Sequence, residues 1–115
     1  MINGAHVILY SRDAEADRAF FRDVLRFPSV DAGHGWLIFA LPPAEVAMHP
    51  TDGPSSHELY LMCADLKAVL AALEASQVRH DPPTEARWGT VVHLDLPSGT
   101  RVGLYQPKHP TAISL

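Results

Sequence analysis

Four polar side chains that could do chemistry are predicted to face one cleft: His6, His49, Glu58 and His93. Imidazole nitrogens and a carboxylate can bind a divalent metal, move protons or fix a polar ligand by hydrogen bonds. Aromatic and aliphatic side chains accompany them on the same predicted face. Apolar walls with a few polar groups are typical of a small-molecule pocket. The sequence therefore predicts that this cleft holds a small molecule.

The elements that position these side chains follow one pattern, a strand, a helix and three strands, which occurs twice. The first unit begins with a strand at residues 5–10 and a helix that is capped by Asp13 and stopped by Pro28. The second begins with a strand at residues 59–63 and a helix capped by Asp65. Apolar residues recur at helical spacing behind both caps. The remaining strands are predicted at 29–32, 36–41 and 45–49, and again at 78–80, 90–96 and 101–106.

Two pairs of strand ends indicate that the pattern is an internal duplication. Residues 39–42 align with 94–97, and residues 46–49 align with 102–105. We expect one module at about residues 4–50, a breaker-rich linker at 51–56, a second module at about 57–107, and a tail at 108–115. The predicted fold is α+β: two tandem βαβββ modules that form a curved, cleft-bearing mixed sheet, with the helices on its outer face.

The alternation of side chains along a strand assigns residues to the cleft. Glu58 precedes Asp65 by the same seven positions that separate His6 from Asp13, so the register favours Glu58 over His57, and a strand bulge would exchange the two. The other residues expected to line the cleft are Ile8, Tyr10, Ile38, Ala47, His49, Tyr60, Met62, Trp88, His93, Gly103 and Tyr105.

Composition and the absence of certain sequence patterns argue against nucleic-acid binding, secretion and membrane insertion. The net charge is −4 without a basic stripe, so we expect no nucleic-acid binding. The first residues lack a signal-peptide pattern, no apolar run is long enough to span a membrane, and the one cysteine, Cys63, fits a reducing compartment. These features predict a soluble cytoplasmic protein. Sheet edges and helix flanks that leave apolar surface to cover predict a homodimer.

Four segments carry a resemblance to a known group of proteins. They are residues 6–10 followed by Asp13, residues 20–25, Arg87-Trp88-Gly89, and residues 96–107. In these segments the chain resembles the vicinal oxygen chelate superfamily, which contains glyoxalases, bleomycin resistance proteins and extradiol dioxygenases. The resemblance covers nearly the whole chain. It implies the fold described above and a small ligand, aromatic or rich in oxygen, between the modules.

The resemblance also implies where a metal would bind. Metal-containing members take one ligand from the first and one from the fourth strand of each module. By position these are His6, Ala47, Glu58 (or His57) and Gly103. Ala47 and Gly103 have no donor atom, so the family's full ligand set is incomplete here.

Two ligand-based functions therefore remain open from the sequence, beside an assembly module whose open sheet faces mainly mediate dimerisation. The first is a protein that binds a small molecule without the full metal site. The second is a metal-dependent lyase or ring-cleaving dioxygenase, in which His49 or His93 completes a set with His6 and Glu58. Two histidines and a carboxylate suit iron(II), manganese or zinc. The sequence assigns no catalytic residue and leaves open whether the protein is an enzyme.

Overall fold

The second half of the chain forms a complete strand–helix–strand unit in the computed structural model, which describes residues 6–45, 47, 49–50, 52–54 and 56–112. Its elements are β3 (Tyr60–Met62), α2 (Leu66–Ala75), β4 (Arg79–His80), β5 (Thr84–Ala86), β6 (Gly89–Asp95) and β7 (Arg101–Pro107). The strand order is β3-β7-β6-β4, and β5 also pairs with β6. Only β3 and β7 run parallel, so the sheet is mixed. The predicted α+β class is confirmed, and β5 is a strand that the sequence did not indicate.

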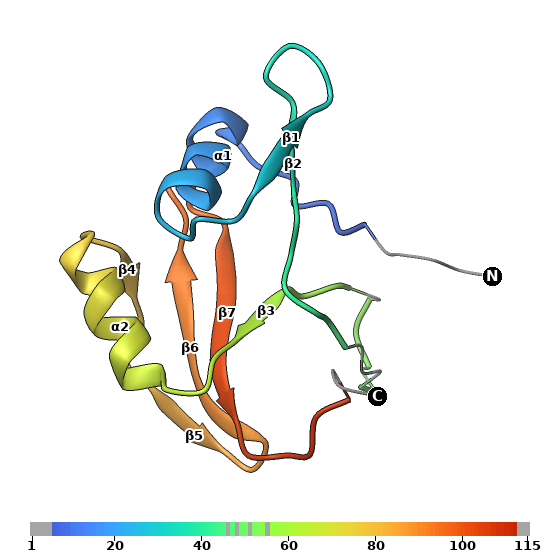
Figure 1. The fold of residues 1–115 in the computed structure, drawn as a ribbon. Coiled ribbons are helices and arrows are strands. Elements are labelled where there is room, and N and C mark those ends of the chain that lie inside the picture. Colours follow the sequence, from blue (N-terminus) through green and yellow to red (C-terminus); the bar gives the residue numbers. More distant parts are fainter. Residues whose placement is uncertain (1–5, 46, 48, 51, 55, 113–115) are drawn as a thin grey trace.

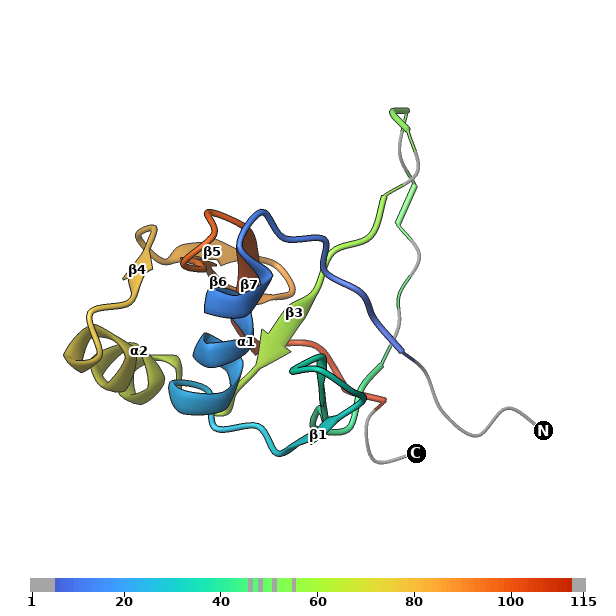
Figure 2. The same ribbon diagram turned by 90° about the horizontal axis from the view of Figure 1, so that it is seen from above.

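The first half contributes a helix and a hairpin: α1 (Ala14–Asp23), β1 (Ser29–Asp31) and β2 (Leu37–Phe39). Residues 6–10, predicted as a strand, are not part of a strand, and neither are Glu45, Ala47 and His49. Ala5, Val46 and Met48 lie outside the described residues. A strand needs a hydrogen-bonded neighbour, and among the described residues these two segments have none. The described residues between β2 and β3 extend away from the sheet (Figure 2).

Both helices begin where their capping residues predict. The Asp13 carboxylate accepts a hydrogen bond from the Ala16 amide at 3.1 Å, and the Asp65 carboxylate accepts one from Ala68 at 3.2 Å. The first helix ends at Asp23, well before Pro28, and Arg26 then takes a positive φ of 61°. A left-handed residue ends a helix without proline.

Both helices cover the same face of the sheet (Figure 1). From α2, Leu66, Leu70 and Leu73 pack on Val92, Leu94 and Leu104. From α1, Phe20 and Phe21 pack on Leu96 and Val102. The strand residues in these two clusters are the alternate positions that the sequence assigned to the core. Among the described residues, no helix lies on the opposite face of the sheet. Neither helix is long and apolar enough to cross a membrane, which is true of every helix in the described residues.

One buried carboxylate ties α1 to the end of the sheet. Asp17 is 7% exposed. Its carboxylate accepts hydrogen bonds from the Ser98 hydroxyl at 2.7 Å and the Ser98 amide at 3.1 Å. Ser98 belongs to the predicted turn between β6 and β7, where Gly99 takes a φ of 91°. Because a buried charge needs such partners, this contact fixes α1 against the sheet end.

Candidate functional site

The helix-free face of the sheet carries the side chains that alternate with the core. Tyr60, Gly103 and His93 lie side by side across β3, β7 and β6, and Met62, Tyr105 and Val91 form the next row. Directly paired residues in a sheet point to the same side. The structure therefore places these predicted cleft residues together on one surface. Their role in ligand binding stays a prediction.

Three aromatic rings gather on this face, and we call Tyr60, Trp88 and Tyr105 the aromatic cluster. Ring centroids are 5.9 Å apart for Tyr60 and Trp88, 5.8 Å for Tyr60 and Tyr105, and 5.1 Å for Trp88 and Tyr105. All three pairs meet edge to face, a favourable arrangement for aromatic rings. Tyr105 is buried, whereas Trp88 is 37% exposed. The cluster is thus a rigid apolar surface with one ring open to solvent.

Gly103 lies directly beneath the Tyr60 ring. A Cβ atom at this position would overlap three carbon atoms of that ring. The missing side chain leaves no space for a ligand here, because Tyr60 from the neighbouring strand fills it. Glycine is needed here for the close approach of the ring to β7.

Burial keeps the tyrosine hydroxyls of the cluster protonated. Burial, with a hydrogen bond to the Glu58 carboxylate, raises the pKa of Tyr60 to about 12. Burial also raises the pKa of Tyr105, and the negative charge of Glu45 adds to this effect. The Tyr105 hydroxyl lies 3.1 Å from His109 Nε2. Both hydroxyls are therefore neutral donors at physiological pH.

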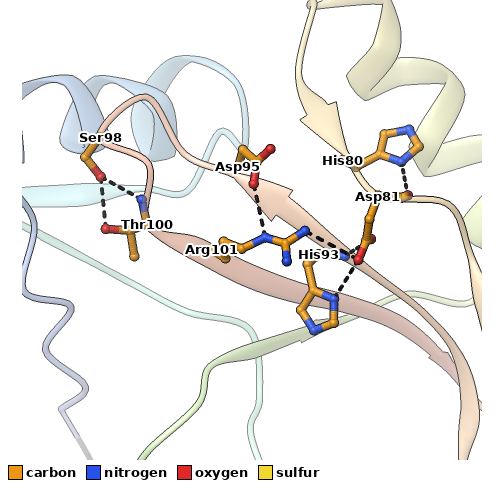
Figure 3. Close-up of polar contacts among 7 residues, drawn as sticks. All are labelled: His80, Asp81, His93, Asp95, Ser98, Thr100 and Arg101. Carbon is orange, nitrogen blue, oxygen red and sulfur yellow. Dashed lines mark hydrogen bonds and ion pairs between the residues drawn. The ribbon is translucent and has the colours of Figure 1, made fainter.

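His93 lies beside the Tyr60 ring, with 6.1 Å between the ring centroids, and belongs to a row of charged and polar residues on the same face. Figure 3 shows the contacts within this row. Asp81 follows β4. Its Oδ2 atom lies 3.0 Å from His93 Nδ1, and its Oδ1 atom accepts a hydrogen bond from the His93 backbone amide at 2.6 Å. Arg101 lies 3.4 Å from Asp81 and 3.1 Å from Asp95. Although burial alone would raise it, these bonds from His93 hold the pKa of Asp81 below its ordinary value. Sequence reasoning missed Asp81, because it lies in a loop beyond the predicted strand.

The predicted site residues of the first half lie apart from any enclosed site. His6, Ile8 and Tyr10 are exposed, and Tyr10 is 88% exposed. His49 and Ala47 are also exposed. Ile38 pairs with Val30 on the face of the hairpin opposite Phe39, which packs in the core. Their contact with a ligand stays a prediction.

The residues present do not fit the metal that the family resemblance implies. Within the described part of the chain, no group of three or more His, Cys, Asp or Glu side chains could hold a metal ion. His6, Glu58 and His49, with His57 or His93 as alternatives, all lie in that part, and they are not brought together as a ligand set. Three protein ligands are usual for a catalytic metal. The function proposed for this protein does not involve a metal.

Two surface hollows lie away from the aromatic cluster. One, of about 330 Å³, is lined by α1 and the β1–β2 hairpin, including Arg18, Asp31 and Leu37. The other, of about 500 Å³, lies beside the β6–β7 turn and includes Phe20, Gln77 and Pro97. Neither contains a residue of the cluster or of the charged row, except Asp95 in the second. The aromatic cluster therefore lies on an open sheet face, outside both hollows.

Solved structures reveal the group to which this architecture belongs. No family model and no curated protein sequence matches the chain. TnmS3, an antibiotic binding protein from Streptomyces sp. CB03234, is 29% identical, with a TM-score of 0.62 over 94% of this chain and 100% of its own. A glyoxalase/bleomycin resistance protein from the same organism is also 29% identical, with a TM-score of 0.58 over 84% and 93%. Lactoylglutathione lyase from Agrobacterium tumefaciens, 18% identical, shares the fold with a TM-score of 0.66 over 90% and 92%.

The chain has the vicinal oxygen chelate fold. This confirms the resemblance noted from the sequence. The glyoxalase and bleomycin resistance proteins of this superfamily share the two helices and the open, curled, mixed sheet. The superfamily fold alone selects no reaction, so it identifies neither a ligand nor an activity.

Proposed function

We propose that this protein binds a small aromatic molecule on the aromatic cluster. The observation that carries the proposal is the packing of Tyr60, Trp88 and Tyr105 on the one sheet face that no helix covers. A flat ring can stack on the exposed Trp88 while the half-buried Tyr60 and the buried Tyr105 hold the indole in place. The similarity to TnmS3, an antibiotic binding protein, supports a ligand of drug-like size. No observation favours the metal-dependent lyase or dioxygenase.

Replacement of Trp88 by alanine should weaken binding of an aromatic probe by about tenfold. The lost stacking and apolar contact are worth roughly 1–2 kcal/mol, and 1.4 kcal/mol corresponds to tenfold in affinity. The probe is 2-naphthol, and its fluorescence in a titration gives the dissociation constant. The matched control is Trp36→Ala, which removes the second tryptophan, located near Arg18 and outside the cluster. Equal losses in the two variants would contradict a site at Trp88.

The protein is proposed to act as a homodimer, because the first half exposes apolar side chains. Val7 is 53% exposed, Ile8 61% and Tyr10 88%. These residues come from the segment before α1, and large exposed apolar side chains that lie close together in the chain are a feature of interfaces. We expect a dimer mass by light scattering at micromolar concentration. The double substitution Ile8→Lys with Tyr10→Lys should give the monomer mass. A monomeric wild-type protein would refute this part of the proposal.

A further inference from the structure

His93 lies beside the aromatic cluster and is partly open to solvent. Its ring centroid is 6.1 Å from that of Tyr60, and its side chain is 36% exposed. It pairs with Gly103 across the β6–β7 ladder, on the helix-free face. A molecule that contacts Trp88 and Tyr60 is therefore within reach of this imidazole.

Asp81 fixes both the orientation and the tautomer of His93. One carboxylate oxygen accepts the backbone N–H of His93 at 2.6 Å, and the other lies 3.0 Å from ring Nδ1. The second oxygen also lies 3.4 Å from the Arg101 guanidinium, which can only donate. Since an ionised carboxylate only accepts, Nδ1 must carry the hydrogen. In the neutral ring, Nε2 is then an acceptor.

The Nε2 atom has no hydrogen-bond partner among the residues that the structure describes. Figure 3 shows this nitrogen on the side of the ring away from Asp81. Backbone and side-chain bonds thus hold an unused acceptor in a fixed direction at the border of an aromatic surface. Such a group can discriminate between ligands that differ by one hydroxyl, since a ligand that covers the nitrogen without donating a hydrogen bond removes it from water and leaves it unpaired, which is costly.

We propose that His93 Nε2 accepts a hydrogen bond from a hydroxyl on the bound ring, so that the ligand class is a hydroxylated aromatic molecule. This rests on the proposed function and narrows it. Asp81 acts as a positioning residue, because it sets the tautomer of His93 without touching the ligand. The aromatic cluster supplies the affinity for the ring, and His93 supplies the selectivity for its substituent.

The test compares 2-naphthol with 2-methylnaphthalene, in which a methyl group of similar size replaces the hydroxyl. Fluorescence titrations are made at about pH 8, above the ordinary imidazole pKa of roughly 6.5. Wild-type protein should bind 2-naphthol about five- to tenfold more tightly, the value of one hydrogen bond of about 1 kcal/mol. The His93→Phe variant should keep binding both probes and lose this preference.

The variant Asp81→Asn tests the role of the tautomer. The His93 amide still needs an acceptor, so the asparagine oxygen takes that bond and its NH₂ group faces Nδ1. Nδ1 must then accept, and the ring hydrogen moves to Nε2. We expect exchanged ¹⁵N chemical shifts for the two ring nitrogens and a preference for 2-naphthol reduced to about twofold or less. The matched control is Glu74→Gln, which alters the carboxylate that contacts His80 at 3.0 Å and should leave the preference unchanged.

The outcomes separate this inference from the proposed function. If wild type binds both probes equally, or if His93→Phe keeps the preference, the inference is wrong while aromatic binding stands. If Asp81→Asn leaves the ring shifts unchanged, Asp81 does not set the tautomer. If wild type shows no saturable binding of either probe, both proposals are overturned.

Discussion

Replacement of Gly103 by alanine should lower the free energy of unfolding by about 1–3 kcal/mol and move Tyr60 out of the aromatic cluster. The new Cβ would overlap the Tyr60 ring. Gly103 is itself buried and paired on both sides, with Tyr60 and His93, so the backbone of β7 cannot yield easily. The ring must turn away, and it then loses its edge-to-face contacts with Trp88 and Tyr105. Urea unfolding followed by circular dichroism measures the loss.

A double-mutant cycle isolates the cause of this effect. With Tyr60→Ala as the background, the methyl group of Gly103→Ala has room, and its cost should fall below about 0.5 kcal/mol. The same variants can be titrated with 2-naphthol, and Gly103→Ala should bind the probe as weakly as Tyr60→Ala does. If Gly103→Ala lowered the free energy of unfolding equally in the wild-type and Tyr60→Ala backgrounds, glycine would be needed for the backbone conformation at position 103. The contact with the Tyr60 ring would then not be the cause.

Replacement of Leu94 by alanine should cost about 2–5 kcal/mol of unfolding free energy. Leu94 is 1% exposed and lies in the cluster that joins β6 and β7 to Leu66, Leu70 and Leu73 of α2. The cost combines the lost burial of the side chain with the cavity that remains. The total free energy of unfolding of a domain is only about 5–15 kcal/mol. The midpoint of urea unfolding should therefore move to a much lower urea concentration.

The control for this prediction is Lys67→Ala on the exposed side of the same helix. Lys67 is exposed, and alanine is a good helix former, so little change is expected. A Leu94→Ala variant within about 1 kcal/mol of wild type would mean that α2 does not depend on this contact.

Local signals in the sequence predicted the helices and the second half of the sheet. Asp13 and Asp65 cap their helices because a carboxylate and the free amides of a first turn lie within a few residues of each other. Alternation along β6 and β7 identified Val92, Leu94, Val102 and Leu104 as core residues, all of which are buried. Both signals depend on near neighbours along the chain.

Features that depend on distant parts of the chain were not predicted. Residues 6–10 have a strand-like sequence, but a strand also needs a neighbouring backbone, and no local pattern reveals whether one is present. In the candidate site, the sequence showed that Gly103 lacks a side chain. It could not show that Tyr60 fills the gap, because that contact crosses from β3 to β7. Asp81 was missed for the same reason, since its partner His93 is twelve residues away on another strand.

The contact between Gly103 and Tyr60 also limits how this protein could change over time. The family resemblance places a metal ligand at position 103, yet a side chain there and the ring at position 60 would occupy the same volume. A single codon change that introduces a carboxylate at position 103 would therefore disrupt the aromatic surface before any metal site existed. Ancestral or divergent sequences should alter positions 60 and 103 as a pair. In this chain, a metal-binding side chain at position 103 and the Tyr60 ring would compete for one place in the fold.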